Sequence, residues 1–600
     1  MNIWLDGLTA LSRHAWAVFG IFLMIAWGQI VVRKILLGIF KERLTDSEYL
    51  SFSMAGWVLP VTLWSIFLFF CAYLFGEAAG KNLSILLVAV SLYNALGKTR
   101  RISLSAFVLI LLIVVFVVLR FSFLQEAVLP SYFDSAEHYR IIKHVSETYL
   151  AGIAPSAVPG QPYYHAGYHL VGAAFSHFFQ IGILDVMLVF GQVVLAVLPI
   201  SLFFIVRHET GSITAGFFAC LLAGLGWHMP SHLANWGKYP ALLSLVCVHF
   251  VLSLGYMLVR EQFKEHRSKI LFLLGVGVLV SGLIHTRSMF VYAGMTLAVL
   301  ITVLWKRSPI NIQRALFGIV VLGFAVATGF IQNNDALAPL LYGYLQTDVW
   351  MLVLVLALIP FSVKYHAGLS FFLITSLALF FLALFIPVEL PGFGVLTILD
   401  RPYVQMLASL PLSIFGGLGF AGLLQWTRRF SPRSNLPARL TVLSVFGFVV
   451  LNASLYRNFY PSTCCQFAGR DDLAAITWLD VSLPSDASIL IASEDFHVTS
   501  LEQKGARVGT DGGVWIKPLT SRRTIPAWRE LDFNQPEVHN EACERRLDYI
   551  YVGGMPQSFD SAQLSSQPAW YREVFALPAA RIYQVIGCEW EIVFMVKVGI

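Results

Sequence analysis

The chain has 600 residues, of which 57% are hydrophobic and 13% are charged, and its mean hydropathy is +0.71. Ordinary soluble domains carry about 25% charged residues, so these values exclude a soluble enzyme, a disordered chain and a nucleic-acid-binding protein. Residues 1–455 hold 28 Lys and Arg against 17 Asp and Glu, whereas residues 456–600 hold 13 against 18. The sequence therefore predicts a membrane domain over 1–455 and a soluble domain over 456–600.

Apolar runs long enough to cross a bilayer recur throughout the first domain. We expect a polytopic α-helical membrane protein with about 12–14 spans. Asp6 and one Arg precede the first run and no small-residue cleavage site follows it, so we expect this run to be retained as a span. The candidate spans are residues 15–32, 52–75, 83–97, 104–121, 185–206, 213–227, 239–259, 270–285, 289–305, 315–331, 349–363, 367–387, 404–426 and 438–455.

Lys and Arg are concentrated in alternate loops between these runs. One set of loops holds 20 Lys and Arg, and the opposite set holds 7. Because positively charged loops stay on the cytoplasmic side, the sequence predicts that the second set of loops and the C-terminal domain face outward.

The outward loop 120–184 is the longest and holds the first candidate site. Its amphipathic and apolar stretches predict two juxtamembrane helices lying in the membrane interface. Asp134 and Glu137 stand at the start of the first helix. Two interpretations of this carboxylate pair stay open: Asp134 caps the helix N-terminus, or it acts as general base toward a hydroxyl group. Both roles can hold together.

Histidines and tyrosines gather in the same loop. His138, His165 and His169 are candidate sugar or acceptor ligands, as are Tyr163 and Tyr164. His165 and His169 are four residues apart and would share one face of a helix. Such a pair could bind a divalent metal, line a phosphate site or simply lie in the interface. No third ligand is evident, so the metal stays unknown and no cofactor is assigned.

Two further outward segments combine cations with rings. The first, WHMPSHLANWGKYP over 227–240, contributes His232, Asn235 and Trp236 as candidate sugar ligands and Lys238 as a candidate phosphate ligand. The alternative is an aromatic belt with a snorkelling lysine. The second consists of two short turns that contribute His285, Arg287 and Arg401 as further candidate phosphate ligands, because guanidinium groups match phosphate oxygens. The alternative for each turn is an arginine that snorkels to the interface.

Helix-like and strand-like segments alternate in the C-terminal domain, which predicts a small α/β fold. A helix is expected from Asp471, and strands are expected at ASILIAS, 547–554 and 580–586. No phosphate-binding P-loop and no dinucleotide fingerprint occurs. The four cysteines of this domain predict structural disulfides, with three pairings open. They are Cys464, Cys465, Cys543 and Cys588.

Several of these segments resemble the GT-C superfamily of integral membrane glycosyltransferases. The resemblance rests on Tyr132-Phe133-Asp134 in the long outward loop, on Pro162-Tyr163-Tyr164-His165, on VLPISLFFIVRHETGSITAGFFACLLAGLG, and on DLAAITWLDVSLPSDASIL followed by GTDGGVWIKPLTSRRTIP. The Asp loop follows the fourth expected span here, whereas the family usually has it after the first. The Trp-Trp-Asp-Tyr-Gly signature of oligosaccharyltransferases is missing, and Asp511-Gly512-Gly513 echoes it loosely.

The resemblance implies a function. A sugar would move from a polyprenyl-phosphate carrier to a hydroxyl of a glycan, lipid or protein, at the outer face of a bacterial or archaeal cytoplasmic membrane. Asp134 would be the general base, with Glu137 beside it, and the anomeric centre would invert. Arg287, Arg401 and Lys238 would stabilise the leaving phosphate, and Asp511 would belong to the acceptor side.

Three alternatives remain open. The first is a flippase or transporter of lipid-linked glycans, which intramembrane charge would mark. The second is a non-catalytic subunit for envelope assembly. The third is a ligase or polymerase that uses lipid-diphosphate glycans, which an arginine cluster in a large outward loop would favour.

Overall fold

The computed structural model describes residues 2–41, 43–95, 102–150, 165–390, 394–430, 435–461, 463–496, 498–501 and 507–588. The chain divides into two compact units. The helical unit comprises Met1–Glu126, His138–Ser462 and Val498–Glu502. The sheet unit comprises Ala127–Glu137, Thr463–His497 and Gln503–Ile600. Residues 127–137 of the long loop therefore group with the C-terminal part of the chain.

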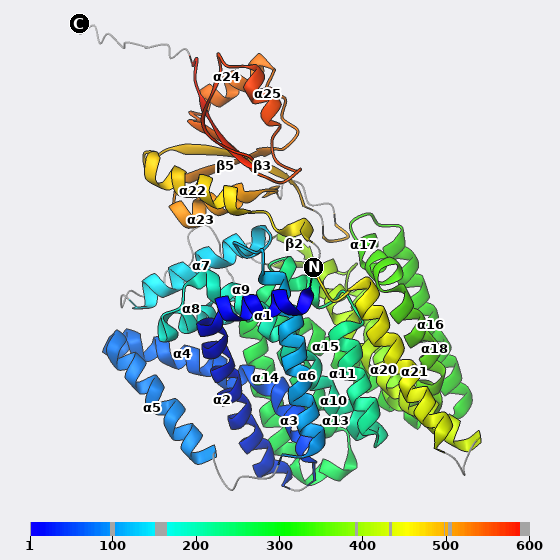
Figure 1. Ribbon diagram of the computed structural model, residues 1–600. Helices are drawn as coiled ribbons and strands as arrows, with labels where there is room; N and C mark the ends of the chain where they lie inside the picture. The colour runs from blue at the N-terminus through cyan, green and yellow to red at the C-terminus, as the bar shows by residue number, and fades with distance from the viewer. Residues whose placement is uncertain are drawn as a thin grey trace, which may run out of the picture. The chain divides into compact units, whose positions relative to one another are not determined.

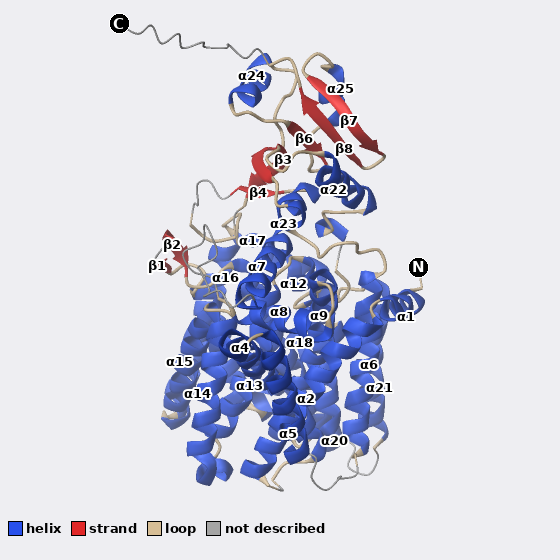
Figure 2. Ribbon diagram, turned by 90° about the vertical axis from the view of Figure 1, so that its left-hand side faces the viewer, coloured by secondary structure: helices blue, strands red, loops and turns tan. Residues whose placement is uncertain are grey.

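Ten helical segments in the described residues are long and apolar enough to cross a membrane, or eleven if one bent pair counts as a span. This makes the chain a polytopic membrane protein. Figures 1 and 2 show these helices side by side in the helical unit. The ten segments are Ala15–Phe40, Asp46–Phe75, Leu104–Leu124, Ile183–Thr210, Tyr239–Leu258, Glu261–Ile284, Arg287–Arg307, Ile310–Gln332, Arg401–Arg429 and Leu436–Tyr456.

The helices of this unit are numbered along the chain. Bounds of the helices are α1 Ile3–Arg13, α2 Ala15–Phe40, α3 Asp46–Gly56, α4 Val58–Phe75, α5 Glu77–Ala95, α6 Leu104–Phe121, η1 Ser122–Leu124, α7 Phe133–Leu150, α8 Gly167–Phe179, α9 Ile183–Val197, η2 Leu198–Ser201, α10 Leu202–Thr210, α11 Ile213–Leu225, α12 Ser231–Asn235, α13 Tyr239–Leu258, η3 Glu261–His266, α14 Arg267–Ile284, α15 Arg287–Arg307, α16 Ile310–Gln332, α17 Ala338–Tyr342, η4 Gly343–Thr347, α18 Val349–Tyr365, α19 Ala367–Leu382, α20 Arg401–Phe430 and α21 Leu436–Tyr456. A short hairpin of β1 (Pro387–Leu390) and β2 (Gly394–Thr397) precedes α20.

Every candidate span falls on a helix, but among the described residues ten or eleven helical segments are long and apolar enough to span, against the 12–14 expected. The helices α11 and α19 are apolar but have only 13 and 16 residues. The helix α5 is not among the ten, because Glu77, Lys81 and Asn82 occupy its first turns. The candidate span 349–363 is α18, whose axis bends by 88° from the preceding turn.

The two juxtamembrane helices expected in the long loop are present as α7 and α8. Tyr163 and Tyr164 lie outside the described residues. The break between the two compact units falls inside α7, after Glu137.

The sheet unit contains the α/β fold expected from the sequence. Its strands are ordered β4-β3-β6-β8-β7, and β5 also pairs with β3, in parallel. The helix expected from Asp471 is α22 (Arg470–Ser482), and the three expected strands are β3 (Ser488–Asp495), β6 (Tyr549–Val552) and β8 (Ala580–Val585). Figure 2 shows the strands of this sheet in red. The other elements are β4 Arg507–Gly509, β5 Arg523–Trp528, β7 Tyr571–Leu577, η5 Thr463–Cys465, η6 Gly512–Trp515, α23 Ile516–Thr520, α24 Pro536–Glu544 and α25 Ser561–Ser566.

Aliphatic and aromatic side chains from the sheet and from α24 and α25 form the core of the sheet unit. Leu490, Ile550, Phe559 and Tyr583 are among its buried members. A disulfide joins Cys543 of α24 to Cys588 beyond β8, so the expectation of a structural disulfide is confirmed at this pair. The bond fastens the last described segment of the chain to the core.

Two carboxylates meet in the interior of the sheet unit. Asp472 accepts hydrogen bonds from the Tyr551 hydroxyl at 2.5 Å and from the Gly469 backbone at 2.7 Å. Asp511 accepts hydrogen bonds from the Ser558 hydroxyl and the Gly513 backbone. Burial, together with the charge of Asp472, raises the pKa of Asp511 to about 6, although these hydrogen bonds act in the opposite direction.

This raised pKa predicts how stability changes with pH. The folded unit binds a proton at Asp511 more tightly than the unfolded chain does, so its contribution to stability is present at pH 4 and is lost as the pH rises through 6. Asp511→Asn should remove about 2–3 kcal/mol of this pH-dependent stability between pH 4 and 7. Pulse proteolysis of the sheet unit in urea, with the exposed Asp486→Asn as control, measures it. An unchanged pH dependence in Asp511→Asn would contradict the assignment.

Candidate functional site

Four histidines from three helices or their ends form one buried group, which we call the histidine cluster. Its members are His138 on α7, His165 just before α8, His169 on α8 and His285 after α14. His138 Nδ1 lies 3.0 Å from His169 Nε2, and His169 Nδ1 lies 3.2 Å from the His165 carbonyl oxygen. The rings of His165 and His285 are 4.4 Å apart, centre to centre. The structure therefore brings together residues that lie as far apart in the sequence as His138 and His285, about a third of the length of the membrane domain.

Tyrosines surround the histidine cluster. Tyr168 stacks on Tyr239 with ring centres 5.6 Å apart, and the His138 ring lies against both. The Tyr403 ring lies 4.9 Å from that of His285, and its hydroxyl is 2.9 Å from Ser244 Oγ. Stacked rings with polar edges suit a ligand that has both an apolar face and hydroxyl groups.

Burial keeps the cluster neutral. It lowers the pKa of His138, His165 and His285 well below the usual value, and neighbouring cations and histidines lower each further. The pKa of His169 falls to about 3, again through burial. Neutral imidazoles offer both a donor and an acceptor nitrogen, so the cluster can hydrogen-bond hydroxyl groups without itself adding charge.

Two cations lie next to this neutral cluster. Arg287 stands two residues after His285, and Lys238 directly precedes Tyr239, whose ring lies 6.3 Å from that of His138. Both cations lower the pKa of His285. Arg287 Nη1 is bonded to Asp400 Oδ2 at 2.6 Å. Asp400 also accepts a hydrogen bond from the Tyr403 backbone at the start of α20. The structure thus brings together three of the four expected phosphate ligands: Arg287, Lys238 and His285.

The fourth, Arg401, follows Asp400 directly in the sequence. Its Nη1 donates to the Ala336 carbonyl at 2.8 Å, and its backbone N–H donates to the Val498 carbonyl at 3.0 Å. These bonds connect the start of α20 to the segment before α17 and to residues 498–501.

His232 and Trp236 belong to a second polar group in the helical unit. The His232 ring contacts those of His228 and Trp236 at 5.4 and 6.1 Å. Burial lowers the pKa of His232 to about 3, with His228 and Arg120 adding to the effect. Asn235 is fully buried on the same short helix, α12.

The centre of the second group is an Asp–His pair that sequence reasoning missed. His228 Nδ1 lies 2.5 Å from Asp348 Oδ2, and the His228 backbone N–H donates to the same carboxylate. Gln405 Nε2 lies 2.8 Å from His228 Nε2. Asp348 is completely buried at the 88° bend between η4 and α18. An acidic residue next to a predicted span was the available signal, because such residues are rarely tolerated there without a role.

Asp134 and Glu137 lie in the part of α7 that groups with the sheet unit. The helix begins at Phe133, so Asp134 is its second residue rather than its N-cap. A carboxylate in the first turn is still favoured by the helix dipole. Tyr132, with φ of 71°, makes the turn before the helix, and its backbone N–H donates to the Cys465 carbonyl at 2.8 Å. The turn therefore fixes where the helix that carries Asp134 begins.

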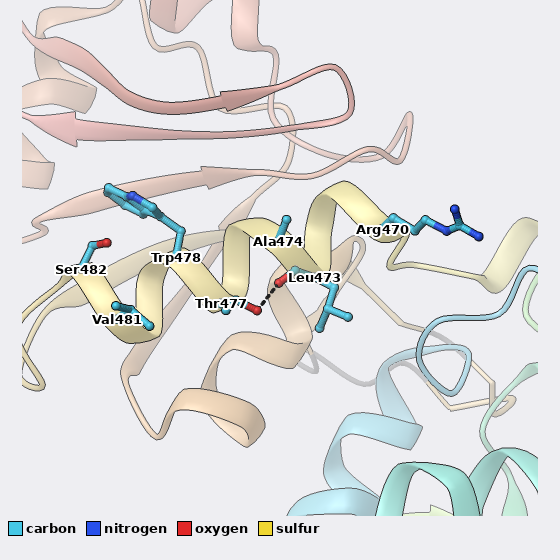
Figure 3. Close-up of a pocket in the computed structure, with 7 residues that line it drawn as sticks. All are labelled: Arg470, Leu473, Ala474, Thr477, Trp478, Val481 and Ser482. Carbon is cyan, nitrogen blue, oxygen red and sulfur yellow. Dashed lines mark hydrogen bonds between the residues drawn. The ribbon is translucent and has the colours of Figure 1, made fainter.

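Asp511 lies in the interior of the sheet unit. It caps η6 through the Gly513 backbone and is completely buried. A shallow hollow elsewhere in this unit is lined by one helix, α22, from Arg470 to Ser482 (Figure 3). It contains none of the expected site residues.

Among the described residues, one group of three side chains lies close enough together to share a metal ion: His539, Cys543 and Cys588. Its two sulfur atoms are joined in the disulfide, and metal-binding cysteines need free thiolates. The group therefore does not suit a metal while the disulfide is intact. A metal requirement stays open.

The chain was compared with known proteins. No protein-family model matches it, and no curated protein matches it at a significant level. Among solved structures, it is similar to the crystal structure of the Archaeoglobus fulgidus oligosaccharyltransferase tethered to an acceptor peptide that contains the NVT sequon. The match has 11% sequence identity and a TM-score of 0.46, and covers 74% of this chain and 69% of that one.

The Asp–His pair predicts a stability effect. His228→Phe leaves the buried Asp348 carboxylate without its ring partner and should lower the free energy of unfolding by about 3–5 kcal/mol. SDS-induced unfolding in mixed micelles measures this change. The double variant His228→Phe with Asp348→Leu buries no charge and should be more stable than His228→Phe alone. A single variant as stable as the wild type would show that the pair does not hold the bend.

Proposed function

We propose that this protein is a membrane glycosyltransferase of the GT-C type. It moves a sugar from a polyprenyl-phosphate carrier to a hydroxyl acceptor, which is a glycan, a lipid or a protein. The reaction takes place at the outer face of the cytoplasmic membrane, where the Lys and Arg distribution puts the long loop and the sheet unit. The donor carries an anionic phosphate, a polar sugar and an apolar tail.

The observation that carries the proposal is the pairing of two cations with a neutral, aromatic-lined histidine cluster. Arg287 and Lys238 both act on His285, and the rings of His165 and Tyr403 flank the same histidine. Fixed cations stabilise a leaving phosphate as negative charge develops on it. Neutral imidazoles and tyrosines suit the hydroxyl groups and apolar faces of a sugar.

Asp134 is the proposed general base. It stands in the first turn of α7, in the long outward loop where GT-C glycosyltransferases carry their catalytic Asp. Asp134 would accept the proton of the acceptor hydroxyl as the oxygen attacks the anomeric carbon, and the carrier phosphate would leave from the opposite side. This direct displacement inverts the anomeric configuration.

The runner-up function is a transporter of lipid-linked glycans, for which a buried acid would be the mark. Asp348 is such an acid. However, its carboxylate accepts hydrogen bonds from the ring and the backbone of His228, and Gln405 occupies the other ring nitrogen. A carboxylate held this way favours a structural role, so glycosyl transfer is the better-supported function.

Asp134→Asn tests the base. The amide keeps the size and the helix position but cannot take up a proton, so sugar transfer should fall by about 10²–10⁴-fold while the fold is retained. Transfer of a radiolabelled sugar by the purified protein measures the loss. Asp185→Asn, which changes a half-exposed carboxylate at the start of α9, is the matched control. Equal transfer by wild type and Asp134→Asn would refute the assignment.

Arg287→Gln tests the phosphate site. The neutral side chain keeps a hydrogen-bond donor but loses the charge that would stabilise the leaving phosphate, so kcat should fall by about 10²–10³-fold. Because Arg287 is paired with Asp400, Asp400→Asn is the informative companion: it breaks the pair and keeps the cation. We expect Asp400→Asn to retain much more activity than Arg287→Gln. The reverse order would assign Arg287 a purely structural role.

A further inference from the structure

The N-terminal helix α1 has three distinct faces. One face packs against the protein: Gly7 and Ala10 are buried, and a Cβ atom at Gly7 would overlap the backbone of Val118 on α6. A second face carries Asp6, Thr9 and Arg13, which recur at the 3- and 4-residue spacing of one helix side. The third face is apolar and exposed.

The large side chains of the apolar face are exposed. Trp4, Leu5 and Leu8 are 48%, 60% and 56% exposed. The exposed Trp16 and Phe19 follow it in the chain, at the start of α2, a helix long and apolar enough to cross a membrane. The exposed apolar side chains of α1 are therefore followed in the sequence by those of a candidate span.

Specific bonds fix α1 at one end of the helical unit. Arg13 Nη1 donates to the Gln125 carbonyl at 2.9 Å, just beyond the end of α6. His14 Nδ1 lies 3.2 Å from Asp185 Oδ1, and Trp16 Nε1 donates to the Phe179 carbonyl at 2.8 Å. Figures 1 and 2 show α1 beside the end of α6, and Figure 1 shows it crossing that end rather than running along the bundle.

A helix at the end of a span, with one apolar and one polar side, has the geometry of an in-plane interfacial helix. Tryptophan favours the same depth, because its ring is amphipathic. We propose that α1 lies in the plane of the bilayer, in the leaflet where α6 ends. Its partner is membrane lipid: Trp4, Leu5 and Leu8 contact the boundary between headgroups and acyl chains, while the exposed Thr9 and Arg13 face the headgroups and water.

The depth of α1 in the bilayer is linked to the histidine cluster through Trp16. Trp16 is bonded to the last turn of α8, the helix that also carries His169. The lipid contact of α1 and the bond from Trp16 together hold the end of α8 at a set distance from the bilayer surface.

Depth-dependent quenching tests the proposal in the full chain. The fluorophore NBD is attached to Leu8→Cys or, as matched control on the polar face, to Thr9→Cys, in nanodiscs of phosphatidylcholine that contain 5-doxyl lipid. The signal of the labelled parent protein, which has seven native cysteines, is subtracted. Quenching should be about threefold stronger at position 8 than at position 9, because only position 8 faces lipid.

Two outcomes would overturn the proposal. Equal quenching at positions 8 and 9 would show that α1 has no lipid-facing side. Protection of position 8 from both doxyl lipid and aqueous iodide would show that protein, such as a second copy of the chain, covers this face. Trp4→Cys replaces Leu8→Cys, and Arg13→Cys replaces Thr9→Cys, if either first variant fails to fold. The result does not depend on glycosyl transfer.

Discussion

A bilayer offers no hydrogen-bond partners, and this constraint governs the helical unit. Backbone groups are satisfied within helices, and buried polar side chains must find partners in the protein. Arg120 meets the constraint by donating to the carbonyl oxygens of Gly224 and Phe459 near two other helix ends. The Asp348–His228 pair meets it at the bend before α18. Polar chemistry is consequently concentrated at helix ends and breaks, and the candidate site lies there too.

The same constraint sets the charge of that site. Burial keeps the four clustered histidines neutral, so the positive charge acting on His285 comes from Arg287 and Lys238. Asp400 orients Arg287 and also caps α20. Two cations among neutral rings would favour a ligand with a negative charge and hydroxyl groups over a lipid that lacks both. A lipid-linked phosphosugar combines these features.

Much of the architecture could be predicted from the sequence. Long apolar runs indicate membrane-spanning helices, and every candidate span lies on a helix of the structure. Ten or eleven segments of the described residues are long and apolar enough to span, fewer than the 12–14 expected, since hydropathy does not show that α11 and α19 have only 13 and 16 residues. The strands β5 and β7 were missed. Pro526 argues against a strand, because proline has no backbone N–H to donate. It is tolerated in β5 because this strand pairs there with β3 on one side. In β7, Arg572 and Glu573 weaken the apolar pattern.

The candidate site was only partly predictable, because the meeting of His165 with His285 depends on the tertiary packing of distant helices. The proposed function is sugar transfer from polyprenyl-phosphate carriers. It can be tested by incubating the purified wild-type protein with a panel of radiolabelled polyprenyl-phosphate monosaccharides and a hydroxyl acceptor extract. We expect one donor to be consumed and its sugar to appear in a product of inverted configuration. A folded protein that consumes no monophosphate donor, but does consume a lipid-diphosphate glycan, would contradict it.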